Sequence, residues 1–214
     1  MNARTLAALL LLLAAAAGCI DNNASVRLSA ACFPPVPNDD GSCSYPATCD
    51  SVMLDNLGVD PSYAPTLGTL IWPFQAVNQR TNNANADGRT NTATAFITGF
   101  KIAYFSSTIS VPTISLEYTT RTIEAGASQV LSIPVVPVSV ASQLAGIPGG
   151  KASVRAEIRA TGHYGDGETF ETGPFSVVVL VSVGGWTGGT CTDITQKVVG
   201  YCPQPGQTGL PLCK

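Results

Sequence analysis

The positions of the cysteines constrain the fold of this chain more than any other feature. The sequence has 214 residues and seven cysteines, and no cysteine lies between residues 50 and 190. One stands alone near the N-terminus, and the others form two groups of three: Cys19, then Cys32, Cys43 and Cys49, then Cys191, Cys202 and Cys213. An odd number leaves one cysteine unpaired where thiols are oxidised to disulfides. We therefore expect one cysteine with a separate role and two cysteine-rich arms around a cysteine-free body.

The first nineteen residues have the layout of an export signal that ends at a cysteine. Arg4 is followed by an apolar run from Leu6 to Ala17, and then by Gly18 and Cys19. Its twelve residues are fewer than the roughly twenty that a helix needs to cross a ~30 Å hydrocarbon core. The run therefore predicts a cleaved signal peptide over residues 1–18.

The segment Ala16-Ala17-Gly18-Cys19 resembles the lipobox of bacterial lipoproteins, and the chain as a whole resembles their cysteine-rich β-sandwich members. This resemblance implies that Cys19 carries acyl chains such as palmitate and becomes the mature N-terminus, fastened to a membrane. Ile20 after the cysteine implies sorting to the outer membrane, on its periplasmic or surface face. Because Ala16 stands where that family usually has Leu, ordinary cleavage after residue 15 or 17 is the alternative.

With Cys19 set aside, the two arms have three cysteines each. Three is an odd number, so full oxidation requires at least one bridge between the arms. We expect the arms to meet in a disulfide-stapled cap at one end of the body, with Cys213 holding the C-terminus. Fifteen connectivities are open, and a zinc site is disfavoured because the cysteine gaps lack the C-x₂-C spacing.

Composition and periodicity divide the mature chain into three parts. Residues 19–66 form a tether and an arm rich in proline, which disfavours helix and central strand, with a short strand at Ser25–Leu28. Residues 67–183 alternate apolar and polar side chains, most clearly in Ala152–Tyr164, as a half-buried strand does. Residues 184–214 form a second arm rich in Cys, Gly and Pro.

The body is expected to be all-β. Gly165-Asp166-Gly167 predicts a tight turn that joins Ala152–Tyr164 to Glu168–Val183, with Pro174 at an edge or bulge. A short helix is expected at Ser139–Ala145. The other predicted strands are Thr69–Val77, Ala93–Phe105, Thr113–Thr119, Thr122–Glu124 and Gln129–Val136. About seven antiparallel strands over nearly 120 residues indicate an immunoglobulin-like β-sandwich.

No complete catalytic set is visible, so we expect no enzymatic activity. The sole histidine, His163, lacks a G-x-S-x-G nucleophile motif and is expected to be exposed at the hairpin. The alternative is a glycan-active enzyme using carboxylates near this hairpin, namely Asp166, Glu168 and Glu171, with Glu157 on an adjacent strand.

Other candidate ligand sites are weak. Asn83, Asn85 and Asp87 followed by Gly88 match the opening of a calcium loop, but Thr94 stands where the bidentate Glu belongs. We therefore expect at best millimolar calcium affinity and no bound cofactor. Trp72 is expected in the core, and Trp186 is expected to cover an end of the body, with an exposed platform for a sugar or protein as the alternative.

Charge narrows the partners further. Without residues 1–18 the chain has ten Lys and Arg against fourteen Asp and Glu, a net charge near −4, and no basic stripe that would favour nucleic acid. The sequence thus predicts a membrane-anchored lipoprotein that binds an envelope protein or a glycan. A role as accessory subunit of an outer-membrane or secretion assembly is a further alternative.

Overall fold

The computed structural model describes residues 25–33, 35–38, 40, 42–49, 56–63, 69–82, 92–185, 195–202 and 210–214. Several predictions fall outside these residues. They concern the signal peptide, Cys19, the calcium loop at Asn83, Asn85 and Asp87, Trp186 and Cys191.

The described residues are mostly strands, so the all-β prediction is confirmed. The elements are β1 (Val26–Ala31), β2 (Val36–Pro37), β3 (Cys43–Ser44), β4 (Leu57–Val59), η1 (Pro61–Tyr63), β5 (Leu70–Asn78), β6 (Ala95–Phe105), β7 (Ile114–Ile123), β8 (Ser128–Val136), α3 (Val138–Leu144), η2 (Pro148–Gly150), β9 (Lys151–Tyr164), β10 (Thr169–Glu171), β11 (Phe175–Ser182), β12 (Val198–Cys202) and β13 (Leu210–Cys213). The short helix expected at Ser139–Ala145 is α3, displaced by one residue.

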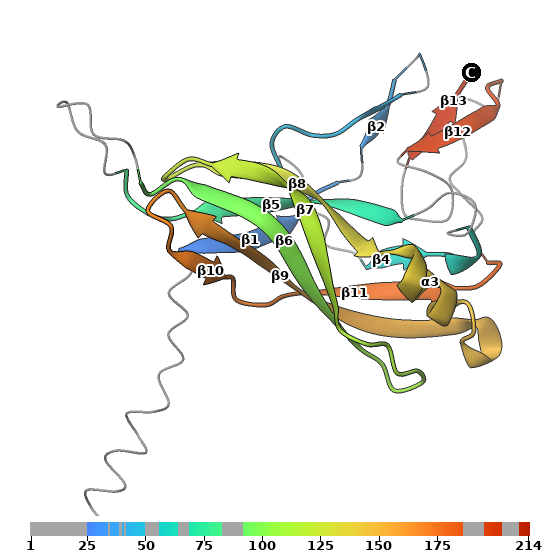
Figure 1. The fold of residues 1–214 in the computed structure, drawn as a ribbon. Coiled ribbons are helices and arrows are strands. Elements are labelled where there is room, and N and C mark those ends of the chain that lie inside the picture. The colour runs from blue at the N-terminus through green and yellow to red at the C-terminus, as the bar shows by residue number, and fades with distance from the viewer. Residues whose placement is uncertain are drawn as a thin grey trace, which may run out of the picture.

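Two sheets enclose a single hydrophobic core (Figure 1). The smaller sheet has the order β1-β5-β8, and the larger has the order β4-β11-β9-β6-β7 with β10 also paired to β9. Within these sheets the pairs are antiparallel except β4–β11, which is parallel. The immunoglobulin-like arrangement of seven strands is not established by this order, because two strands come from outside the predicted body.

The N-terminal arm is less irregular than its prolines predict. The short strand expected at Ser25–Leu28 is longer, since β1 extends to Ala31 and pairs with β5. Farther along, Leu57 and Val59 of β4 are almost fully buried against β11. Both pieces bury apolar side chains in the shared core, and this burial outweighs the local effect of the prolines around them.

Two strand boundaries differ from those expected. Thr113–Thr119 and Thr122–Glu124 are parts of one strand, β7, whose pairing with β6 shifts near Gly99. Glu168–Val183 is instead divided, because Thr172 interrupts the ladder between β10 and β11. Its hydroxyl accepts the N–H of Ala160 at 3.0 Å, and its own N–H donates to the Ala160 carbonyl at 2.9 Å. Pro174 lies in this break, as predicted for an edge or bulge position.

The core lies between the facing sides of the two sheets. Strand β9 contributes the inward residues of its alternating pattern, and β5 contributes Trp72 and Phe74, both with 0% exposure. The prediction that Trp72 is a core residue is confirmed. Helix α3 adds three buried side chains: Val140, Ala141 and Leu144.

Strand register defines two opposite ends of the body. At the first, which we call the hairpin end, Val26 pairs with Asn78, and the β9–β10 turn follows Tyr164. At the second, the cap end, β9 begins at Lys151 opposite Ser182, and β6 ends at Phe105. The 14 residues of β9 rise ~3.3 Å each, which separates the two ends by about 45 Å.

The two arms meet at the cap end. Ribbon β2–β3 and ribbon β12–β13 lie beside each other in the upper right of Figure 1. One disulfide joins Cys43 to Cys202, 159 positions apart, and a second joins Cys32 to Cys49. Cys213 is also disulfide-bonded. The expected bridge between the arms is therefore present, and we call the two ribbons the cap.

Candidate functional site

A cation held against an aromatic ring organises the hairpin end. The Arg80 guanidinium lies 3.4 Å from the centroid of the Tyr164 ring and donates to Asp166 Oδ2 at 3.0 Å and to Glu168 Oε2. Tyr164 is only 1% exposed. The Glu168 N–H, and then the Arg80 guanidinium, hold the pKa of Asp166 below its ordinary value. We call Arg80, Tyr164, Asp166 and Glu168 the Arg80 clasp.

The clasp adjoins the first described residue of the chain. The backbone N–H of Ser25 donates to the Tyr164 hydroxyl at 3.0 Å, and the Ser25 carbonyl accepts from Gln79 N–H at 2.8 Å. Next to them, the buried Asn78 side chain donates to the carbonyls of Ala93 and Ile123 at 2.8 and 3.1 Å. The point at which β1 enters the fold is thus tied to β9 through Tyr164 and to the end of β5 through Gln79.

His163 is exposed on β9, next to the hairpin turn. Its ring stacks on Phe96 with centroids 5.1 Å apart, and its Nδ1 lies 3.1 Å from the Tyr164 carbonyl oxygen. Among the described residues, no serine hydroxyl or cysteine thiol is hydrogen-bonded to this ring. The nucleophile–base contact that a hydrolase needs is not formed here.

The four acidic residues singled out near the hairpin each have a cationic partner. Glu157 lies 3.3 Å from Arg155, and Glu171 contacts Lys101 and, at 3.5 Å, Arg159. In the β9–β10 register, Glu171 lies opposite Thr161. Thr161 is four positions from Glu157 along β9, so the two glutamates are not directly opposite each other. The structure therefore brings Glu157 and Glu171 to cations rather than to each other, whereas Asp166 and Glu168 share the Arg80 guanidinium.

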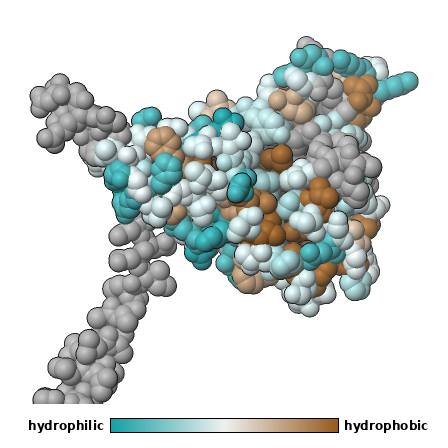
Figure 2. All heavy atoms as spheres, in the orientation of Figure 1, coloured by the Kyte–Doolittle hydropathy of each residue, from teal (hydrophilic) through white to brown (hydrophobic). Residues whose placement is uncertain are grey.

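Exposed apolar side chains have an uneven distribution. Among the described residues, the large apolar side chains that are exposed all lie in the cap or in the half of the body next to it: Phe33, Val36, Tyr45, Phe105, Val138, Leu180 and Val199. Figure 2 shows hydrophobic residues gathered over this side and a mostly hydrophilic surface toward the hairpin end. Exposed apolar area that gathers on one side of a domain is typical of an interaction surface.

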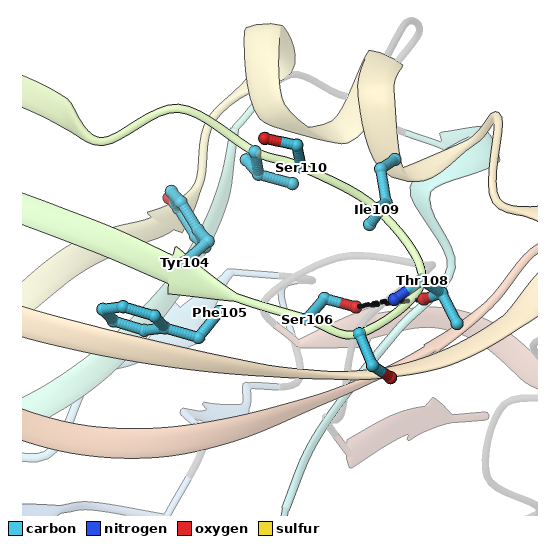
Figure 3. A pocket seen from close by; sticks show the side chains of 8 residues that line it. Tyr104, Phe105, Ser106, Thr108, Ile109 and Ser110 are labelled. Atoms are coloured by element: carbon cyan, nitrogen blue, oxygen red, sulfur yellow. Dashed lines mark hydrogen bonds between the residues drawn. The ribbon is translucent and has the colours of Figure 1, made fainter.

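The loop between β6 and β7 adds an open pocket of about 450 Å³ at the cap end (Figure 3). Its lining runs from Tyr104 to Val111 and includes the hydroxyls of Ser106 and Thr108, which lie 3.0 Å apart. Tyr104 donates to the Val135 carbonyl at 2.7 Å, and burial raises the pKa of its hydroxyl. Sequence reasoning missed this pocket, and its only signal was the hydroxyl-rich run after Phe105.

Phe105 marks the border between this pocket and the outer face of the larger sheet. The Arg155 guanidinium lies 4.7 Å from the centroid of the Phe105 ring, and Phe105 is opposite Arg155 in the β6–β9 register. Phenylalanine and arginine are each enriched at protein–protein interfaces relative to the rest of the surface.

Neither a metal centre nor a membrane-spanning helix is found in the described part of the chain. No group of three or more His, Cys, Asp or Glu side chains there could hold a metal ion. No helix among the described residues has the length and apolar character that a bilayer crossing requires. Comparisons with protein-family models, with curated proteins and with solved structures returned no match.

Proposed function

We propose that this chain is an exported protein, lipid-anchored through Cys19, whose cap end binds a protein or a glycan of the cell envelope without catalysing a reaction. In this proposal the two-sheet body, interpreted as an immunoglobulin-like sandwich, is a rigid spacer. The signal-like residues 1–18 and the lipobox-like segment support export and anchoring.

One observation carries the binding role: the exposed apolar side chains lie at the end opposite the chain entry. Ser25 enters the body at the hairpin end, whereas Val36 and Val199, each 56% exposed, lie in the cap. A patch near the anchor would be open to burial in the anchoring bilayer. A patch held about 45 Å away is available to a partner above the membrane plane.

The ion-paired carboxylates also favour binding over catalysis. Exposed ion pairs such as Lys101–Glu171 and Arg155–Glu157 contribute little to stability, yet each pairs a carboxylate with a neighbouring cation. Such a surface remains soluble while the cap end provides the apolar contact area.

The test is site-specific photocrosslinking in living cells of the source organism. A photoreactive amino acid is placed in the cap, at Val36 or Val199, and at Thr169 of the hairpin end as the matched control. We expect crosslinks to a defined envelope component from the cap positions alone. Crosslinks to the same component in equal yield from Thr169, or none from the cap, would contradict the proposal.

The same experiment separates the forms of the proposal. A single crosslinked protein that also co-purifies in fixed stoichiometry would identify an accessory subunit of an envelope assembly. Crosslinks to polysaccharide would identify a glycan ligand.

A further inference from the structure

We infer that the hairpin end is the bilayer-facing surface of this protein, and that the Arg80 clasp fixes the chain's exit so that the body stands end-on above the lipid headgroups. This inference rests on the proposed lipid anchor at Cys19 and adds the orientation that the anchor imposes. The partner of this surface is the polar headgroup layer of the membrane that holds the acyl chains.

The covalent reach from the anchor is short. Five residues lie between Cys19 and Ser25, so six residue steps of at most ~3.6 Å give a reach of about 20 Å. From Ser25 onward the backbone is held, because its N–H and carbonyl bond to Tyr164 and Gln79. The tether is therefore shorter than the twelve residues that separate Cys19 from Cys32, because β1 takes up the rest.

The clasp opposes the detachment of the first residues of β1 from the body. To pull Ser25 and Val26 away, the Tyr164 hydroxyl must lose its donor while the ring stays covered by Arg80. Arg80 is held in turn by Asp166 and Glu168 across the hairpin turn. Arg80 is thus a positioning residue that acts on the tether through Tyr164.

The chemistry of the hairpin end suits a headgroup layer rather than the hydrocarbon core. None of the exposed large apolar side chains of the described residues lies there. Its described surface presents charged or polar groups such as Asp166, Glu168 and Thr169, all exposed. Such a surface does not insert into the hydrocarbon core, because moving charged groups there is costly.

The experiment measures the height of two points above a bilayer. The lipidated full-length mature protein is placed in lipid nanodiscs that contain a headgroup-labelled acceptor lipid. A donor fluorophore is attached through an azide-bearing amino acid at Thr169 or at Lys151. Thr169 pairs with His163, twelve positions from Lys151 along β9, so the two donors differ in height by about 40 Å if the body stands upright.

We expect several-fold stronger energy transfer from position 169 than from position 151. Arg80→Gln should reduce this contrast and accelerate hydrogen exchange at Val26–Leu28, while the thermal midpoint changes little. Arg159→Gln, which removes a surface ion pair with Glu171 on the outer face, is the matched control and should leave both readouts unchanged. Equal transfer from the two positions in the unmutated protein would overturn the orientation, and an unchanged contrast in Arg80→Gln would overturn the role of the clasp.

A failure of the proposed anchor gives a different result. Mass spectrometry that finds no acyl chains on Cys19 would refute lipid anchoring directly. The orientation would still be measured, by coupling Cys19 of that protein to a maleimide lipid and repeating the two transfer measurements.

Discussion

The hairpin end and the cap end of this molecule are held together by different kinds of force. At the hairpin end, Tyr164 is 1% exposed under the Arg80 guanidinium, and Asn78 is fully buried and hydrogen-bonded. In the cap, Val36 and Val199 are largely exposed, and a disulfide joins ribbons that are distant in sequence. Non-covalent packing thus suffices at one end, whereas the other end depends on covalent bonds.

The difference follows from how much apolar area each end can bury. A two-stranded ribbon is marginal in water because it has no second layer to cover its apolar face. The β2–β3 and β12–β13 ribbons have that geometry, so disulfides supply what burial does not. The exposed apolar side chains of the cap do not pack in the core and can therefore contact another molecule. This supports the binding role proposed above.

The largest expected effect comes from removing the bridge between the arms. Cys43→Ser with Cys202→Ser opens a loop that spans 159 positions, and chain entropy then lowers the free energy of unfolding by about 5 kcal/mol. Cys32→Ser with Cys49→Ser, spanning 17 positions, should cost about 3 kcal/mol. Urea titrations followed by far-ultraviolet circular dichroism measure both. Equal losses for the two pairs would show that the cap does not depend on the long-range bridge.

An effect of intermediate size is expected at the hairpin end, where Gly162 lets β6 and β9 approach closely. A Cβ at this position would lie 2.0 Å from the Phe96 carbonyl oxygen and 2.9 Å from the Phe170 ring. Gly162→Ala should therefore lower the free energy of unfolding by about 3 kcal/mol, as overpacking against backbone does.

The matched control for that variant lies at the cap end. Gly146 follows α3, and a Cβ there would have the Gln143 carbonyl oxygen as its nearest neighbour, at 3.4 Å. Gly146→Ala should change stability by less than about 0.5 kcal/mol. If the two alanine variants unfold at the same urea concentration, the hairpin end is not packed as tightly as we conclude.

The smallest effect is a pH dependence that both ends share. Ser42 holds the pKa of Asp40 in the cap below its ordinary value, and the Glu168 N–H does the same for Asp166 at the hairpin. When folding lowers the pKa of a carboxyl, that group stabilises the folded state at pH values above its unfolded pKa, which is near 3.8. This stabilisation is lost as the pH falls from there through the lower pKa of the folded state. Both carboxyls are exposed, so we expect a small loss of stability below about pH 4.

Carboxyl titration by nuclear magnetic resonance checks that prediction residue by residue. Ser42→Ala should raise the pKa of Asp40 and leave that of Asp166 unchanged. Arg80→Gln should raise the pKa of Asp166 only in part, because the Glu168 N–H remains. A simultaneous shift of both carboxyls in either variant would show that the two ends are coupled.

Several features of the fold were predictable from local patterns. The alternation in Ala152–Tyr164 predicts β9, the odd count of cysteines in each arm requires a bridge such as Cys43–Cys202, and Trp72 lies in the core as expected. Other features depend on contacts with distant residues. Thr172 divides a predicted strand because its hydroxyl replaces a ladder partner for Ala160, and no local pattern signals that exchange.

The candidate site shows the same division. Asp166 and Glu168 were visible in the sequence as hairpin carboxylates, but their partner Arg80 lies 86 and 88 positions away. The role of Leu57 and Val59 as an added strand was likewise hidden, because proline density describes the local chain and not the sheet edge that receives it.

By itself, the amino-acid sequence determined the strand-forming body, the two cysteine-rich arms and the requirement that they be joined, because periodicity and parity are properties of the chain alone. Only the tertiary structure decided that β1 and β4 complete the sheets, that Arg80 covers Tyr164 beside the chain entry, and that the exposed apolar groups lie at the opposite end. Each of these depends on the burial and pairing of residues far apart in sequence, and the free energy of such contacts exists only once the core has formed.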